Sequence, residues 1–255
     1  MKTLMTHFYY GDISPEFSQK LALTLMEAGA DILEIGIPYS DPVCDGEIFQ
    51  AACRQALKQG ITPDDVFSGI KKIREKTDIP IYLTSYFGPV FKIGVERFLK
   101  KALESGVNGF IIPDLPLEEQ KFKLPLIQFA TVYSNEERLR QIVQASRDFI
   151  YVMSLPGITG DKHHGRENLK KLLGMIKRQT DKKTYVGFGI RTPEEAAEII
   201  EMGADGVIIG SAIAEIYSLH PLKYEESLEK IRKLVINIKK AISWEYNSKE
   251  RQIYG

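Results

Sequence analysis

The sequence is poor in the residues that hold disulfide-rich and metal-bound proteins together. It has two cysteines, Cys44 and Cys53, which form no Cys-X-X-Cys pair, and its four histidines show no metal-ligand spacing. A disulfide scaffold and a zinc site are therefore not expected. It also lacks a run of 18 apolar residues and a long apolar segment near its first residues. We therefore expect no membrane span and no secretory signal, and we expect a cytoplasmic protein.

The sequence has no excess charge of either sign. Lys plus Arg and Asp plus Glu both number 34, which gives a formal net charge of +0. The Lys-rich stretches at 71–76, 168–183 and 230–240 are interleaved with apolar residues, as on solvated helix faces. No basic face is predicted, so a nucleic-acid partner is not expected. The hydrophobic content of 44% is that of a globular protein with a sizeable core.

Three stretches of the sequence resemble one another. They are EAGADILEIG at 27–36, ESGVNGFIIPD at 104–114 and EMGADGVIIGS at 201–211. In each, a predicted helix ends at a glycine, the residue that most readily adopts the left-handed conformation just past a helix. A short polar turn and four or five apolar residues follow, as in strands that are covered on both faces of a parallel sheet. The repeated unit predicts βαβ architecture along the whole chain.

Eight such strands, with helices between them, predict an α/β fold with one (β/α)8 barrel domain (a TIM barrel) over residues 1–255. This fold needs about 250 residues, and no linker-like stretch divides the chain. Strands are expected at 4–9, 32–36, 80–84, 108–112, 126–131, 148–153, 184–188 and 206–209. Helices are expected at 15–28, 47–58, 63–76, 92–104, 135–146, 166–178, 193–202 and 223–243. Between the fourth and fifth strands there is room only for a turn or two of helix, so this unit is expected to be short.

Glu34 is the first candidate for chemistry. It lies in the apolar string ILEIG, between Leu33 and Ile35, near the end of a predicted strand. Barrel active sites lie at the C-terminal ends of the strands, and a carboxylate is costly to bury unless it is paired. Burial would raise the pKa of Glu34 and let it act as an acid near neutral pH. A structural ion pair, or a strand-end residue that faces water, is the alternative.

The loop after this strand adds Asp41 and Asp45, in IPYSDPVCDGEIFQ. Asp-Pro and Asp-Gly are common turn dipeptides, so a simple turn explains each aspartate alone. Together with Glu34 they place two or three carboxylates over one barrel mouth. Carboxylates in different environments are a standard arrangement for an acid and a base.

Glycines follow the last three predicted strands. Gly157 and Gly160 belong to GITG, Gly189 follows the seventh strand, and Gly210 follows the eighth. Barrels often bind phosphate between the loops after strands seven and eight and the N-terminus of a short extra helix, and residues 211–217 suit that helix. Single glycines more often only mark turns, but three coincident glycine turns favour a phosphate site. No P-loop lysine motif is present, so nucleotide hydrolysis is not suggested.

These motifs resemble those of the tryptophan synthase alpha subunit family. The string LEIGIPYSDPVCDG resembles its signature, in which a leucine–glutamate–glycine strand runs into a serine–aspartate–proline loop that ends in aspartate–glycine. GITG, GFGI and GSAI resemble its phosphate-binding loops in the same order, and PDLP at 113–116 resembles the segment after its fourth strand. The resemblance covers nearly the whole chain.

The resemblance implies a lyase of tryptophan biosynthesis. The family's reaction is a retro-aldol cleavage of indole-3-glycerol phosphate into indole and glyceraldehyde 3-phosphate, with no cofactor in this subunit. Pyridoxal phosphate is expected only in a beta subunit, with which the chain would form an α2β2 heterotetramer.

The resemblance also implies roles for single residues. Asp45 matches the carboxylate that takes the indole N–H proton, and Glu34 matches the acid–base that protonates the ring carbon and handles the glycerol hydroxyl. Tyr151 matches a supporting tyrosine near that glutamate, and Phe8 matches an apolar residue that lines the indole pocket. Phosphate contacts, and a loop threonine linked to closure over the substrate, are implied at Gly160, Gly189, Gly210, Ser211 and Thr159.

The sequence departs from the family pattern at several places. Glu47 stands where proline usually follows the aspartate–glycine pair, and Ile13 stands where proline usually follows Gly11-Asp12. The chain begins almost at its first strand, so the N-terminal helix that usually plugs the barrel bottom is expected to be missing. These departures concern partner binding and stability more than chemistry.

Three other functions stay open on the sequence. A stand-alone lyase that releases indole freely would carry the same residues. Another phosphate-sugar barrel, such as an isomerase or a prenyl-glyceryl-phosphate synthase, would use the late glycines but has no need of the SDPxxDG string. A non-catalytic activator of a partner is the third, and the presence of both Glu34 and Asp45 argues against it.

Overall fold

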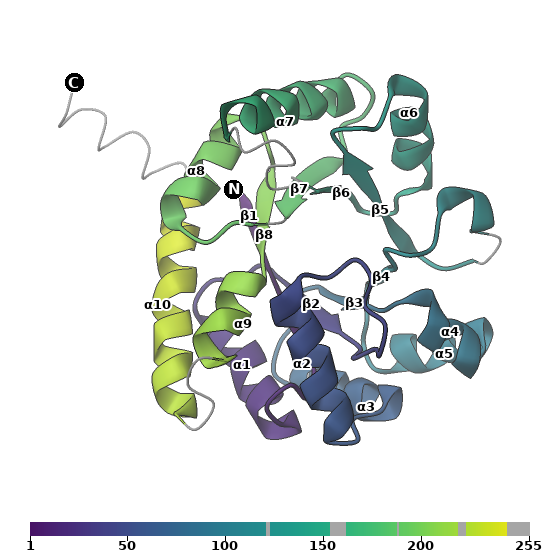
Figure 1. Ribbon diagram of the computed structural model, residues 1–255, viewed down its shortest axis with the longest axis vertical. Helices are drawn as coiled ribbons and strands as arrows, with labels where there is room; N and C mark the ends of the chain where they lie inside the picture. The colour runs from purple at the N-terminus through teal and green to yellow at the C-terminus, as the bar shows by residue number, and fades with distance from the viewer. Residues whose placement is uncertain (121–122, 154–161, 188, 219–222, 244–255) are drawn as a thin grey trace.

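Eight parallel strands close into a barrel in the computed structural model of the chain (Figure 1). The structure describes residues 1–120, 123–153, 162–187, 189–218 and 223–243. Each strand pairs with the next in sequence, and the last pairs with the first. The strands are β1 (Thr3–Tyr9), β2 (Ile32–Gly36), β3 (Ile81–Thr84), β4 (Gly109–Ile111), β5 (Leu126–Thr131), β6 (Phe149–Met153), β7 (Lys183–Gly187) and β8 (Gly206–Ile209). The predicted barrel is confirmed, and the strand bounds agree with the prediction to within one residue.

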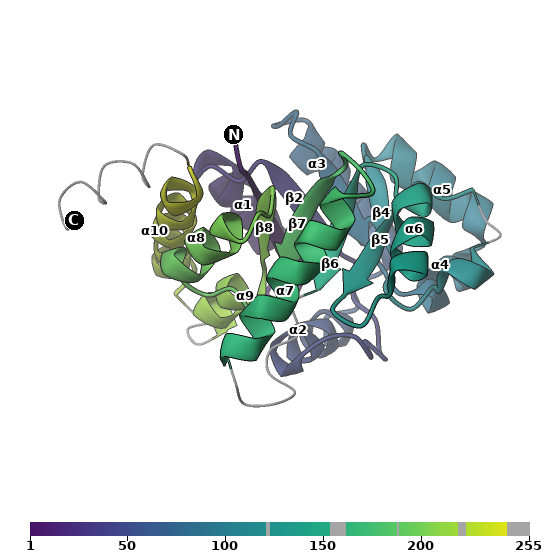
Figure 2. The same cartoon turned by 90° about the horizontal axis from the view of Figure 1, so that it is seen from above.

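Helices cover the outside of the barrel, as Figure 2 shows for α5, α6 and α7. They are α1 (Pro15–Glu27), α2 (Glu47–Lys58), α3 (Pro63–Arg74), α4 (Phe87–Ile93), α5 (Val95–Glu104), α6 (Glu136–Ala145), α7 (Lys162–Lys177), α8 (Pro193–Glu201), α9 (Ser211–Ser218) and α10 (Tyr224–Ile242). Within the ranges that the structure describes, none of them combines the length and apolar character that a membrane crossing requires.

Side-chain caps explain where two of these helices begin. At α3 the Thr62 hydroxyl accepts a hydrogen bond from the Asp65 N–H, and the Asp65 carboxylate accepts one from the Thr62 N–H. Thr192 and Glu195 form the same reciprocal pair at α8. These bonds satisfy N–H groups that the first turn of a helix leaves without an intrahelical acceptor.

The helix expected over 92–104 is two helices, α4 and α5, separated at Gly94. The φ angle of Gly94 is +88°, a conformation that L side chains rarely adopt. Its N–H donates to the carbonyl of Phe91, and its carbonyl accepts from the N–H of Phe98. One glycine thus ends the first helix and begins the second, which corrects the prediction of a single element.

The fourth βα unit is short, as predicted. Between β4 and β5 the described residues hold one 3-10 turn, η1 (Leu117–Glu119), and no α-helix. At the other end, β1 is the first element and already starts at Thr3.

Two apolar layers make the core. One lies between the strands and the helices, and it contains Leu4, Phe8, Leu33 and Ile35. The other fills the inside of the barrel with one residue from each strand: Met5, Ile32, Tyr82, Ile111, Ile127, Phe149, Tyr185 and Ile208. Because strand side chains alternate between faces, the residue two positions after each of these also points inward. On β1, β2, β3 and β6 these next residues are His7, Glu34, Thr84 and Tyr151.

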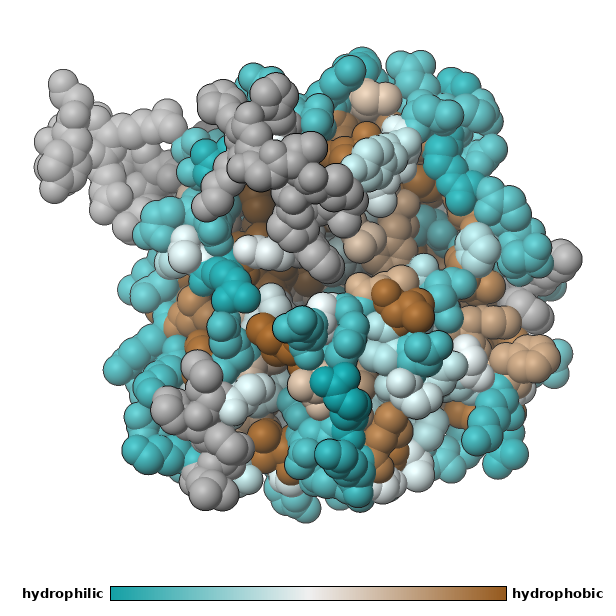
Figure 3. All heavy atoms as spheres, viewed as in Figure 1, coloured by the Kyte–Doolittle hydropathy of each residue, from teal (hydrophilic) through white to brown (hydrophobic). Residues whose placement is uncertain are grey.

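Polar residues predominate at the periphery of the face in Figure 3, and hydrophobic patches lie between them, several near the centre.

One carboxyl is enclosed close to the barrel mouth. Asp12, which follows β1, is 6% exposed. Burial raises its pKa to about 6, and the hydroxyl of Tyr217 on α9 offsets part of this rise. Asp12 is therefore a buried acid outside the apolar layers.

Candidate active site

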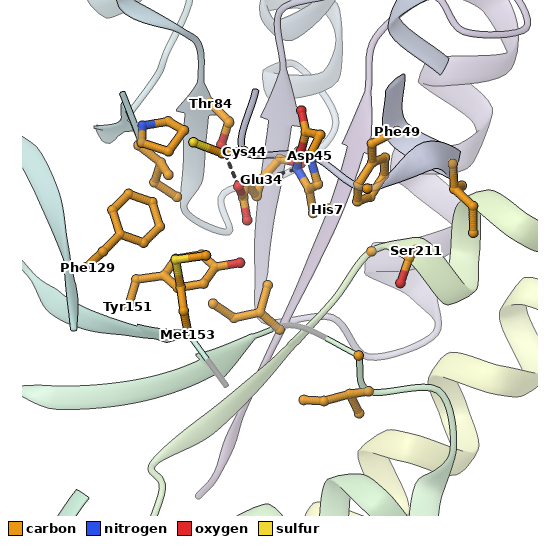
Figure 4. Close-up of a pocket in the computed structure, with 18 of the residues that line it drawn as sticks. His7, Glu34, Cys44, Asp45, Phe49, Thr84, Phe129, Tyr151, Met153 and Ser211 are labelled. Atoms are coloured by element: carbon orange, nitrogen blue, oxygen red, sulfur yellow. Dashed lines mark hydrogen bonds and ion pairs between the residues drawn. The ribbon is translucent and has the colours of Figure 1, made fainter. Parts of the chain in front are cut away.

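A cavity of about 560 Å³ opens at the C-terminal ends of the strands. Its volume suits a small organic substrate. Strands β1 to β6 and β8, and the segments after β2, β4, β7 and β8, line it with the following residues: His7, Glu34, Cys44, Asp45, Gly46, Glu47, Ile48, Phe49, Thr84, Ile111, Pro113, Phe129, Tyr151, Met153, Gly189, Ile190, Arg191, Ile208, Gly210 and Ser211. The structure thus brings the two predicted carboxylates, Glu34 and Asp45, into one cavity (Figure 4).

Glu34 is buried in the wall of this cavity, with 3% of its surface exposed. Its Oε1 accepts a hydrogen bond of 2.5 Å from the Thr84 hydroxyl and lies 3.4 Å from His7 Nδ1. Its Oε2 is buried and has no hydrogen-bond partner among the described residues. One oxygen is therefore held by the protein, and the other is enclosed without a hydrogen-bond partner in the described residues.

Burial raises the pKa of Glu34. His7 and the hydrogen bond from Thr84 oppose this rise, and the charge of Asp45 adds to it. A raised pKa keeps a proton on the carboxyl at higher pH than usual, as an acid that works near neutral pH requires.

Asp45 lies in the loop after β2 and is held by two tyrosines. Its Oδ2 accepts hydrogen bonds from the hydroxyl of Tyr9, at 2.6 Å, and from that of Tyr86, at 2.9 Å. Its backbone carbonyl accepts a third, at 2.8 Å, from Gln50 Nε2. Although Asp45 is a loop residue, side chains from β1, α2 and the end of β3 fix its position.

A glycine makes room for the first of these tyrosines. Gly36 ends β2, and a Cβ atom there would lie 2.5 Å from the ring of Tyr9. Any larger residue would displace the ring and its hydroxyl from Asp45. The glycine of the ILEIG string therefore serves the placement of the loop carboxylate.

Tyr151 reaches into the cavity from β6, near Glu34 in Figure 4. Its ring packs against Phe129 with a centroid distance of 4.9 Å. Burial raises its pKa well above the usual value, and the charges of Glu34 and Asp45 add to the rise. The phenol therefore keeps its proton and can donate a hydrogen bond.

Three residues of the predicted anion site line the same cavity. They are Gly189, Gly210 and Ser211, and Ser211 is the first residue of α9. The first N–H groups of a helix have no intrahelical acceptor and favour an anion. A Cβ atom at Gly210 would lie 2.8 Å from the ring of Phe49, so only glycine fits below that ring. Thr159 and Gly160, which were also expected here, lie outside the described residues.

The structure does not place Phe8 in the cavity. Phe8 is fully buried in the layer between the barrel and the helices, and its neighbour His7 lines the cavity instead. The parity of β1 explains this correction, because Met5, His7 and Tyr9 point inward and Leu4 and Phe8 point outward.

Several residues of the site were not identified from the sequence. His7, Thr84 and Arg191 line the cavity, and Tyr9 and Tyr86 hold Asp45. For His7 and Tyr9 the alternation along β1 was the available signal, and for Thr84 and Tyr86 it was their place at the end of β3. Asp41 is exposed and is not a lining residue, so it stays a turn residue.

The departure at Glu47 lies at the start of α2. Glu47 is the first residue of this helix, where a carboxylate is favoured by the helix dipole, and it also borders the cavity. In the described part of the chain, no group of three or more His, Cys, Asp and Glu side chains is arranged to hold a metal ion.

Comparison with known proteins agrees with this geometry. The family model described as tryptophan synthase alpha chain matches residues 1–243. A tryptophan synthase alpha chain from Caldanaerobacter subterraneus subsp. tengcongensis is 36% identical over 248 residues, which cover 94% of each chain. The solved structure of tryptophan synthase subunit alpha from Legionella pneumophila is 33% identical, with a TM-score of 0.83, and covers 94% of this chain and 92% of that one.

A chain in the solved tryptophan synthase complex from Pyrococcus furiosus is also similar. It is 30% identical, with a TM-score of 0.83, and the match covers 94% of this chain and 99% of that one.

Proposed function

The chain belongs to the tryptophan synthase alpha chain family, a family of lyases, and from this premise we propose how its cavity cleaves indole-3-glycerol phosphate. The products are indole and glyceraldehyde 3-phosphate, in the pathway of tryptophan biosynthesis. The observation that carries the proposal is the pair of carboxyls in one cavity. Glu34 is buried with Oε2 unpartnered, and Asp45 accepts two tyrosine hydroxyls.

Glu34 is the acid of the first step. Its carboxyl transfers a proton to the indole ring carbon that carries the glycerol chain, while Asp45 removes the proton from the ring nitrogen. The ring becomes an indolenine, in which the bond to the glycerol chain can break. The buried, proton-retaining Glu34 suits the acid role, and Asp45 faces the nitrogen as the base.

The same groups complete the cleavage in reverse roles. The Glu34 carboxylate takes the proton of the adjacent glycerol hydroxyl, whose oxygen becomes the aldehyde oxygen of glyceraldehyde 3-phosphate. The electrons of the broken C–C bond return to the ring, and Asp45 gives its proton back to the nitrogen. We propose that Tyr151 supports Glu34 during the reaction, because its phenol keeps its proton and lies close to that carboxyl in the cavity. Only protons move between protein and substrate, so we propose that the chain itself uses no cofactor.

We propose that the glycine-rich end binds the substrate phosphate. Gly189, Gly210 and Ser211 offer backbone N–H groups and a hydroxyl, and the start of α9 supplies a favourable dipole. Arg191 borders the same end of the cavity, and its ion pair with Glu215 offsets part of the positive charge that it brings there. On the family resemblance, we propose that Gly160 and Thr159 also belong to this site.

The proposed partner is a tryptophan synthase beta subunit that carries pyridoxal phosphate, in an α2β2 heterotetramer. Apart from Met1, the most exposed large apolar side chains in the described residues are Phe91 at 71%, Tyr133 at 69% and Val43 at 67%. They follow β3, β5 and β2, so all three lie toward the C-terminal ends of the strands. Exposed apolar side chains at one end of a molecule suit a protein interface, and we propose that the beta subunit docks there, near the loop 38–47.

The test is to mix the chain with indole-3-glycerol phosphate and to measure indole with and without a beta subunit. A partnered alpha subunit is slow alone and strongly stimulated by beta, whereas a stand-alone lyase is equally fast in both. Glu34→Gln serves as the control for background cleavage. Absence of indole in both conditions would reject the proposal. The predicted cytoplasmic location is a separate matter, which cell fractionation tests.

A further inference from the structure

His7 is a polar residue that lines the cavity where its apolar neighbour Phe8 was predicted. It lies on β1 directly beside Glu34 in the strand pairing, and 7% of its surface is exposed. Because His7 lines the cavity, this small exposed part faces the space in which the proposed reaction takes place. The proton transfers proposed for Glu34 and Asp45 do not involve His7.

Among the described residues, the polar contacts of His7 Nδ1 are with Glu34. Nδ1 lies 3.3 Å from the backbone carbonyl of Glu34 and 3.4 Å from its Oε1. A carbonyl oxygen only accepts hydrogen bonds, so Nδ1 carries the hydrogen when it bonds there. That hydrogen also faces the carboxyl oxygen that Thr84 holds from the other side.

The ring of His7 is fixed by its neighbours. It packs edge-on against Phe49 and Tyr9, with centroid distances of 4.7 Å and 5.2 Å. Gly210 lies behind it, so close that a Cβ atom there would be 3.1 Å from His7 Cβ. A ring confined on these sides keeps Nδ1 directed at Glu34.

We propose that His7 is a positioning residue for Glu34, which with Thr84 holds Oε1 so that Oε2 faces the substrate. Oε2 has no partner among the described residues, whereas Oε1 has Thr84 and His7. A carboxyl with one oxygen fixed loses less freedom when it transfers a proton than one that can rotate. This inference rests on the proposed function of Glu34 and adds the group that orients it.

Three substitutions of His7 separate the hydrogen bond from the packing. His7→Asn puts an amide nitrogen at the position of Nδ1, His7→Gln puts one near the position of Nε2, and His7→Phe keeps the ring alone. In the complex with beta subunit, His7→Phe and His7→Gln are expected to lower kcat about tenfold, with KM changed less than threefold. His7→Asn is expected to stay within about threefold of the wild-type kcat, because its amide nitrogen can keep the hydrogen bond. The loss of about tenfold in the other two variants is the effect expected when a hydrogen bond to a charged group is removed.

Equal losses in all three variants, or none in His7→Phe, overturn the positioning role. A loss that appears in KM and not in kcat also overturns it, because it assigns His7 to substrate binding. A crystal structure of His7→Phe gives a readout that does not depend on activity. We expect the Glu34 carboxyl to be rotated there, and a carboxyl that keeps its place refutes the inference even if the wild-type chain released no indole and the proposed function failed.

Discussion

Replacing Asp12 with asparagine is expected to stabilise the protein at pH 7 and above. Asp12 is 6% exposed, and burial raises its pKa from the usual 3.8 to about 6. A carboxyl with a raised pKa binds its proton more tightly in the folded state than in the unfolded chain. Its ionisation therefore weakens the fold as the pH rises from about 4 to about 6, and the cost stays constant above that.

The magnitude follows from the size of the shift. A rise from 3.8 to about 6 is a little over two pKa units, and each unit corresponds to about 1.4 kcal/mol. Asp12→Asn is therefore expected to gain up to about 3 kcal/mol over the wild type between pH 4 and pH 7. For a domain of this size, that amounts to a rise in Tm on the order of 6–12 °C.

Urea unfolding of both proteins at half-unit steps from pH 4 to pH 8 measures this difference directly. Asp181→Asn is the matched control, because Asp181 is an exposed aspartate far along the chain and its replacement should change little at any pH. The reasoning is refuted if the difference between Asp12→Asn and wild type is the same at pH 4 and pH 8. It is also refuted if the control gives the same pH-dependent gain.

The other predictions concern the proposed reaction. Glu34→Gln and Asp45→Asn are each expected to lower indole release by about a hundredfold or more, with folding and substrate binding retained, because general acids and bases contribute on that scale. Near-full release by either variant, in a protein that melts normally, would falsify its role. Ser211→Asp introduces negative charge at the proposed phosphate site, at a position that already carries a side chain, and is expected to raise KM far more than it lowers kcat. Glycerol phosphate should compete with the substrate and glycerol should not, and equal inhibition by both contradicts a phosphate site. A beta subunit with a substrate analogue is expected to slow hydrogen exchange at 38–47, and unchanged exchange in a demonstrated complex rejects docking near this loop.

The barrel was predictable because its signals are local. A parallel strand covered on both faces is a continuous apolar run, and the glycine before several of these runs marks the preceding helix end. The break at Gly94 was missed because one glycine within a helical pattern is often tolerated. Only its φ angle of +88° in the folded chain shows that it separates two helices.

The candidate site was predictable only in part. Glu34 and Asp45 carry their own signal, since a carboxylate in an apolar strand and an aspartate in a turn-rich loop both invite explanation. The residues that orient them come from other strands, and the barrel closure alone brings them near. Phe8 was assigned to the cavity through the family resemblance, which implies an apolar residue of β1 in the indole pocket. Both faces of β1 carry apolar or aromatic residues, so composition could not show that His7 points inward.

The two carboxyls are mounted on different parts of the molecule. Glu34 belongs to a strand, so its place is set by the barrel itself, whereas Asp45 belongs to a loop that two tyrosine hydroxyls fasten to β1 and to the end of β3. Exchanging residues 37–46 as a cassette therefore alters the base and leaves the acid untouched. A directed-evolution library in this loop, with Tyr9 and Tyr86 kept, varies one half of the acid–base pair against a constant other half.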